Sequence, residues 1–238
     1  MTMNRREAVG AMAGMGALLL ADPKAGPLQA SAASQGPAPN IVPLPFKAGG
    51  LKGLSEKLIT SHHDNNYAGA VKNLARVRAD LANLPKDAAP FTVGGLRQSE
   101  LTFQNSAILH ELYFGNLGGD GRPGATVSRH LGQAFGSLGA FESQFRAVGN
   151  SLAGGSGWAI LGHCFHTDEL RIFWSGHHTQ GMAATVPLLV MDMYEHAYQM
   201  DYSAAAAKYI EAFFQNIQWD EVERRMTRSR KAQDALRG

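Results

Sequence analysis

The chain has 238 residues, of which 45% are apolar and 18% charged, and its formal net charge is +2. This balance is ordinary for a packed globular protein and excludes a disordered or collagen-like chain. A net charge this low does not indicate the strongly basic surface that binds nucleic acids, so no nucleic-acid partner is expected.

The first 33 residues are predicted to be a targeting segment. Arg5 and Arg6 precede the nearly uncharged run 8–21, which is too short and too rich in glycine for a membrane span. Adjacent arginines before a mild apolar stretch are typical of a twin-arginine export signal, and small residues at 30–32 allow cleavage. An uncleaved anchor, or a chance arginine pair before a helix, is the alternative. We expect a periplasmic or otherwise exported protein with no membrane segment once residues 1–33 are removed.

Two long helices are predicted next. Proline and glycine make residues 34–53 an irregular leader. A helical pattern then begins after Ser55, which suits an N-cap, and ends at Pro85. A second helix is predicted over 98–116, followed by a pair of glycines. Because a short linker joins them, the two helices should form an antiparallel hairpin, an N-terminal domain over 54–118.

Residues 125–238 are predicted to form a second domain with a different pattern. Short helical segments are followed by strand-like runs and then by closing helices. This order predicts an α+β fold, with a helical hairpin followed by helices around a small antiparallel sheet of about three strands. The predicted helices are 126–135, 138–148, 194–200, 204–216 and 220–231, and the predicted strands are 158–165, 170–174 and 185–191.

A pair of metal-ligating side chains lies at one predicted strand-to-helix junction. Asp192 and His196 stand four residues apart, a spacing that can direct a carboxylate and an imidazole at one metal ion. Taken alone, an N-cap aspartate followed by a helical histidine would explain the same pair. The nine histidines of the chain do not decide between these alternatives by their number.

The residues around this pair resemble a known family. The run Asp-Met-Tyr-Glu-His-Ala-Tyr at 192–198 is similar to the Asp-x-Trp-Glu-His-Ala-Tyr signature of iron/manganese superoxide dismutases. Gly-Ser-Gly-Trp at 155–158 is similar to the family's strand entry, and the closing helices also resemble the family. The resemblance extends over 43–225, nearly all of the chain that follows the predicted signal.

The resemblance implies one iron or manganese ion per subunit, bound by three imidazoles and one carboxylate. Asp192 and His196 supply two of these ligands. His62 and His110 stand where the family has its ligands on the two helices of the hairpin, and Val-Lys-Asn-Leu at 71–74 supports the register. The implied reaction converts superoxide to hydrogen peroxide and dioxygen while the metal is alternately reduced and oxidised.

Other positions depart from the family's pattern. Many members carry a glutamine that contacts the solvent molecule on the metal, whereas this chain has His177 and His178 on a shorter loop. His178 is our candidate for this outer-sphere catalytic role, and an exposed loop histidine is the alternative. Ala70 replaces the family's gateway tyrosine and Asn66 its gateway histidine. Tyr67, which precedes Ala70 by one helical turn, could place its hydroxyl in the access channel or could simply pack.

The resemblance also implies a homodimer. Glu195 stands where the family has an interface carboxylate, which accepts a hydrogen bond from the partner subunit's His196. Gln199 replaces a tyrosine that meets the gateway residue across this interface, so an amide pair with Asn66 is possible. The residues predicted to surround the metal site and the interface are Asn66, Trp158, Tyr194, Glu195 and Gln199.

Two rival functions keep the same fold. A family relative with weak dismutase activity would act in redox chemistry or metal storage, and the altered gateway favours it. A structural or partner-binding protein would retain only the fold, and the four intact ligand residues argue against it. The sequence leaves open iron against manganese, and dimer against tetramer.

Overall fold

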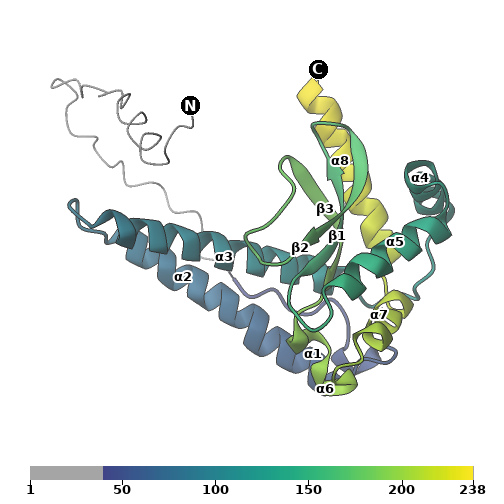
Figure 1. Ribbon diagram of the computed structural model, residues 1–238, viewed down its shortest axis with the longest axis horizontal. Coiled ribbons are helices and arrows are strands. Elements are labelled where there is room, and N and C mark those ends of the chain that lie inside the picture. The colour runs from purple at the N-terminus through teal and green to yellow at the C-terminus, as the bar shows by residue number, and fades with distance from the viewer. Residues whose placement is uncertain (1–39, 238) are drawn as a thin grey trace, which may run out of the picture. The chain divides into compact units, whose positions relative to one another are not determined.

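The computed structural model describes residues 40–237 (Figure 1). These residues lie in one compact unit, whereas the predicted export signal and its cleavage site lie outside the described residues. Within 40–237, no helix is both long and apolar enough to cross a membrane. The division into domains at 54–118 and 125–238 stays a prediction.

The predicted helical hairpin is confirmed. Its two arms pack side by side along their length (Figure 1). The first arm is one helical rod in which a single π-helical turn interrupts the α-helix. The elements of the hairpin are α1 (Glu56–Ser61), the π-helical turn η2 (His62–Tyr67), α2 (Ala68–Ala82) and α3 (Pro90–Gly115).

Local sequence explains where the helices of the hairpin begin. Ser55 caps α1, because its hydroxyl accepts a hydrogen bond of 3.1 Å from the backbone N–H of Leu58. Helix α3 begins earlier than the predicted residue 98, since Pro90 suits the first position of a helix. Gly94 and Gly95 lie inside the helix although glycine is a poor helix former, and both are exposed.

The rest of the described chain confirms the α+β fold. One antiparallel sheet has the strand order β2-β1-β3, with β1 (Trp158–Cys164), β2 (Glu169–Ser175) and β3 (Thr185–Asp192). A single helix over 194–200 is not observed, because Tyr198 leaves helical geometry with a φ of −148°. The helical elements are α4 (Ala125–Phe135), α5 (Leu138–Ser151), the 3₁₀ turn η3 (Glu195–Ala197), α6 (Gln199–Tyr202), α7 (Ala206–Gln215) and α8 (Trp219–Arg237).

The central strand β1 sets the position of the site. Every residue of β1 is buried, and its register pairs Trp158 with Asp192 at the end of β3. Pro187 is tolerated in β3 because this strand lies at the edge of the sheet. Asp192 therefore ends its strand directly beside Trp158, with the sheet as a rigid support.

Asn116 joins the hairpin to the sheet. It follows α3, and its buried side chain accepts from the backbone N–H of Val190 at 2.9 Å and donates to the Val190 carbonyl at 3.2 Å. Val190 is one of the last residues of β3, so this amide links the end of the helix that carries His110 to the strand that carries Asp192. The two elements cannot slide past each other without breaking both bonds.

Helix α8 extends beyond the predicted end at residue 231. Its last turns are bound to the β1–β2 hairpin by side chains that no local pattern indicated. The Ser229 hydroxyl lies 2.7 Å from Nδ1 of His163, and the Gln233 amide donates to the Phe165 carbonyl at 2.7 Å. These tertiary contacts stabilise a strongly charged helix end that has little apolar surface of its own.

Candidate metal centre

Four side chains predicted as metal ligands converge at one point of the described structure. His62 comes from η2, His110 from α3, Asp192 from the end of β3, and His196 from η3. One ligand atom from each of them lies within 4.8 Å of the others. Only the His196 side chain reaches the surface, with 26% of its area exposed.

The carboxylate of Asp192 is oriented by the backbone. Its Oδ1 accepts a hydrogen bond of 2.8 Å from the N–H of Tyr194, which leaves Oδ2 to face the histidines. Oδ2 lies 3.1 Å from Nε2 of His62, 3.2 Å from Nε2 of His196 and 3.6 Å from Nε2 of His110. Three imidazole nitrogens and one carboxylate oxygen thus point at a common centre, a donor set that suits iron, manganese or zinc.

His110 has the tautomer that a metal ligand needs. Its Nδ1 donates to the carbonyl of Ser106 at 2.7 Å, so Nε2 carries the lone pair. Within residues 40–237, this buried Nε2 has no hydrogen-bond partner. A buried, unpartnered acceptor is unfavourable unless something binds it, and a metal ion among these four side chains would do so.

Burial sets the charges at the site. Desolvation lowers the pKa of His110 to about 3 and also lowers the pKa of His62, so both rings are neutral at neutral pH. Burial opposes the charge of Asp192, but the neighbouring histidines, His196 first, hold the pKa of this carboxyl well below its usual range. Neutral imidazoles and an ionised carboxylate are the protonation states in which these groups bind metals.

Aromatic rings enclose the cluster. The rings of Phe114 and Tyr113 lie 5.0 and 5.2 Å from the His62 ring, and Trp158 meets His110 edge to face at 5.2 Å. Tyr194 stacks on His196 at 5.4 Å. The predicted neighbours Trp158 and Tyr194 therefore do lie against the cluster, in a largely dry environment that strengthens electrostatic interactions.

Sequence reasoning missed the residue that holds Asp192 from behind. The hydroxyl of Tyr209, in α7, donates to the backbone carbonyl of Asp192 at 2.7 Å, and its oxygen lies 3.2 Å from the hydroxyl of Tyr113. Both tyrosines are completely buried. The only signal was the similarity of the closing helices to the family, because neither tyrosine lies near Asp192 in sequence.

His178 lies beside the cluster. Its Nδ1 accepts a hydrogen bond of 3.1 Å from the indole N–H of Trp158, and its ring stacks on Tyr194 at 4.8 Å. The ring centroids of His178 and His110 are 6.3 Å apart, and desolvation lowers the pKa of His178 to about 4. Asn105 of α3 donates to the His178 carbonyl and fixes the loop. His177 is exposed and bonds only within its own loop.

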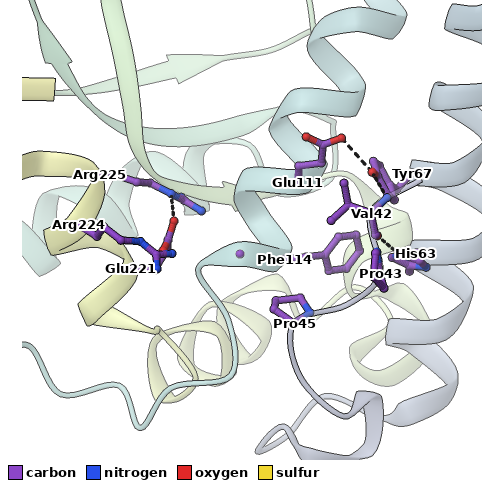
Figure 2. A pocket seen from close by; sticks show the side chains of 11 residues that line it. Val42, Pro43, Pro45, His63, Tyr67, Glu111, Phe114, Glu221, Arg224 and Arg225 are labelled. Atoms are coloured by element: carbon purple, nitrogen blue, oxygen red, sulfur yellow. Dashed lines mark hydrogen bonds and ion pairs between the residues drawn. The ribbon is translucent and has the colours of Figure 1, made fainter. Parts of the chain in front are cut away.

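The structure turns the hydroxyl of Tyr67 away from the ligands. This hydroxyl accepts from the N–H of Val42 at 2.8 Å and donates to Oε1 of Glu111 at 2.9 Å (Figure 2). The ring is 1% exposed and lies 6.3 Å from the His110 ring, and burial raises the pKa of Tyr67 to about 12. The hydroxyl is thus engaged with the leader and α3, and its place in an access channel stays a prediction.

The predicted interface residues lie at the surface. Glu195 and Gln199 are exposed and Asn66 is half-buried. Among residues 40–237, the side chains of these three form no hydrogen bond or ion pair. Glu195 directly precedes His196, which is the one ligand residue that reaches the surface. A second subunit at this face would therefore meet both.

Comparisons with known proteins agree with this geometry. Residues 123–225 match the family described as iron/manganese superoxide dismutases, C-terminal domain. An iron superoxide dismutase of Cupriavidus metallidurans is 46% identical over 178 residues, which cover 74% of this chain and 90% of the relative. An iron superoxide dismutase of Aquifex pyrophilus is 32% identical, with coverage of 81% and 93%. A manganese superoxide dismutase of Haloferax volcanii is 33% identical, with coverage of 75% and 90%.

These similarities extend over both the hairpin and the sheet, and they confirm the resemblance inferred from the residues at 192–198. Relatives named for iron and relatives named for manganese both match, so the comparisons do not select one metal. With 46% identity across most of both sequences, this chain belongs to the iron/manganese superoxide dismutase family.

Proposed function

We propose that this chain is an exported superoxide dismutase with one iron or manganese ion per subunit. It converts superoxide to hydrogen peroxide and dioxygen, the activity for which its relatives are named. The observation that carries the proposal is the buried Nε2 of His110, which has no partner in the described structure and lies 3.6 Å from Oδ2 of Asp192. His62 and His196 face the same oxygen, so four ligands are ready without rearrangement.

The protein groups prepare the site for electron and proton transfer. Held by His62, His110, Asp192 and His196, an iron or manganese ion would supply the reversible one-electron chemistry that dismutation of superoxide needs. Asp192 stays ionised and is held by the Tyr194 N–H and the Tyr209 hydroxyl. Because both bonds are made before substrate arrives, the carboxylate needs no reorganisation during turnover.

His178 is the proposed outer-sphere donor. Its Nδ1 accepts from Trp158, so the ring proton resides on Nε2, the only other nitrogen. Burial keeps the ring neutral near pH 7, which leaves this single N–H as its donor. His178 can therefore donate a hydrogen bond through Nε2 to a solvent molecule or anion at the metal site.

The ligand assignment is tested by metal content and turnover on the same sample. Wild-type protein should contain one iron or manganese per subunit by elemental analysis. His110→Ala and Asp192→Ala should lose metal and activity together, because each opens the ligand set. His177→Ala, a histidine exposed on a loop, is the matched control and should keep both. Full metal occupancy in both ligand variants would contradict the assignment.

A second candidate function is a metal-binding relative with weak dismutase activity, acting in redox chemistry or metal storage. Ala70 favours it, because this residue stands at the family's gateway position, is buried and offers no hydroxyl. Such a protein would hold a full complement of metal while its superoxide turnover stayed near the rate of free metal ions. Rapid turnover by the metal-loaded protein would exclude it.

Export through the twin-arginine route is proposed for the segment that precedes the described residues. This route carries folded proteins, so the metal would be bound in the cytoplasm before release. With Arg5 and Arg6 both changed to lysine, the precursor should accumulate in the cytoplasm. Unchanged export of this variant would remove the twin-arginine proposal.

A further inference from the structure

Val42, in the leader, is held by its backbone. Its N–H donates to the Tyr67 hydroxyl at 2.8 Å, and its carbonyl accepts from Nε2 of His63 at 2.9 Å. The residue as a whole is 51% exposed. Both partners lie in η2, the π-helical turn that carries His62. The turn therefore binds the backbone of the leader at Val42. These two hydrogen bonds do not depend on which side chain stands there.

Tyr67 extends this attachment to the second ligand-bearing helix. Figure 2 shows its hydroxyl between Val42 and Glu111, to which it donates at 2.9 Å. Glu111 directly follows His110 in α3. One run of hydrogen bonds thus joins the leader, the turn of His62 and the helix of His110.

A cavity of about 230 Å³ lies under this part of the leader (Figure 2). Its walls include Val42, Pro43, Tyr67, Glu111 and Phe114. Because a cavity provides no packing contacts on that side, the hydrogen bonds carry most of the attachment at this end. Phe114 separates the cavity from the metal site, since its ring lies 5.0 Å from that of His62.

The leader is fixed again a few residues further on. Phe46 packs against the core at Gly118, where an added Cβ would lie 3.0 Å from the Cβ of Phe46. Between the two attachments, Pro43 and Pro45 fix their own φ angles and favour extended conformations at Val42 and Leu44. The segment 42–46 is therefore short, stiff and held at both ends.

We infer that residues 42–46 form a strap that positions the two helices bearing His62 and His110, with Tyr67 and Glu111 as positioning residues. This inference rests on the metal site proposed above. A π-helical turn is uncommon and less stable than an α-helical one, so η2 depends on such outside contacts. Loss of the hydrogen bonds of the strap raises the rate of metal release while the protein is still folded. The mature chain must then retain Val42, whatever the site of signal cleavage.

The test uses the full-length protein loaded with iron or manganese and measures metal release to a chelator. Val42→Pro removes the backbone N–H that donates to the Tyr67 hydroxyl, and Tyr67→Phe removes that hydroxyl. Val42→Pro should release metal about three- to tenfold faster, as expected for one net hydrogen bond, and Tyr67→Phe, which loses two, should release it at least as fast. Val42→Ala keeps the backbone bonds and should release metal at the wild-type rate.

Two further variants separate positioning from general stability. Glu111→Gln keeps an acceptor oxygen for Tyr67 and should behave as wild type, whereas Glu111→Ala loses one bond of Tyr67 and should resemble Val42→Pro. Ser229→Ala removes a buried hydrogen bond between α8 and β1, remote from the strap. It should lower the melting temperature without changing metal release. Equal release rates in Ser229→Ala and Tyr67→Phe would overturn the positioning role.

Amide hydrogen exchange gives a readout that needs no metal. The Val42 amide should exchange slowly in wild type and about tenfold faster in Tyr67→Phe, in both metal-free and loaded protein. If Val42→Pro and Tyr67→Phe release metal at the wild-type rate, the strap inference fails while the metal site stands. If the wild-type protein takes up neither iron nor manganese, the proposed metal site is wrong. The strap is refuted separately if the Val42 amide of the wild-type protein is not protected from exchange.

Discussion

At the scale of single residues, we compare His178 with the glutamine that many family members carry, because the two side chains differ in acid–base chemistry. Trp158 fixes its orientation through a bond of 3.1 Å, and Tyr194 covers one face of its ring. A glutamine side chain could donate from nearly the same place but could not reproduce the imidazole's acid–base chemistry. Ala70, at the position of the family's gateway tyrosine, is buried and offers no hydroxyl for this role.

We predict that His178→Ala keeps its metal but loses most superoxide turnover, because none of the four ligands is changed. His178→Gln should recover part of the turnover, since its amide can still donate. Elemental analysis and superoxide turnover on the same samples check both variants, with His177→Ala as the neighbouring control. If His178→Ala turned over at the wild-type rate while His177→Ala did not, the donor role would move to His177.

At the scale of elements, the site depends on how α3 is held against β3. Asn116 provides this connection through two bonds to the backbone of Val190, and both residues are buried. The same amide oxygen also lies 3.4 Å from Nη1 of Arg225 in α8. One side chain thus ties together a helix of the hairpin, an edge strand and the C-terminal helix.

Asn116→Ala should lower the free energy of unfolding by about 2–3 kcal/mol, because the N–H and carbonyl of Val190 lose their partner in the interior. Denaturant unfolding of the metal-free protein measures this change without any contribution from the metal. Asn83→Ala is the control, since Asn83 is an exposed residue at the end of α2 and should cost under about 1 kcal/mol. Similar losses for both variants would show that Asn116 is not a special connection.

At the scale of the whole molecule, the predicted homodimer concerns the exposed edge of the site. His196 is the ligand residue with solvent exposure, and the side chain of Glu195 beside it makes no hydrogen bond or ion pair within residues 40–237. In a two-fold dimer, Glu195 would accept from the partner subunit's His196, and each subunit would support the other's site. Dimerisation and activity would then be coupled.

Glu195→Ala should therefore weaken the dimer and lower turnover together. Sedimentation velocity over a range of protein concentrations measures the first effect, and superoxide turnover at the same concentrations measures the second. Glu142→Ala, a change on α5 away from the proposed interface, is the control. An intact dimer with full activity in Glu195→Ala would count against the interface role.

The sequence by itself determined the fold class and pointed to His62, His110, Asp192 and His196. It could do so because metal chemistry demands particular side chains, and because Asp192 and His196 lie within one short motif. Helix periodicity and strand runs are likewise local patterns, so the hairpin and the three strands were predictable. The start of α3 was not, since Gly94 and Gly95 inside it are poor helix formers.

Only the tertiary structure decided the contacts that hold these residues in place. Val42 meets Tyr67 across 25 residues of sequence, Trp158 meets His178 across 20, and Asn116 meets Val190 across 74. Each of these bonds joins a side chain to a group whose position follows from the packing of another element. Because a hydrogen bond depends on distances of a few tenths of an ångström, no local pattern of residue types specifies such a partner before the chain has folded.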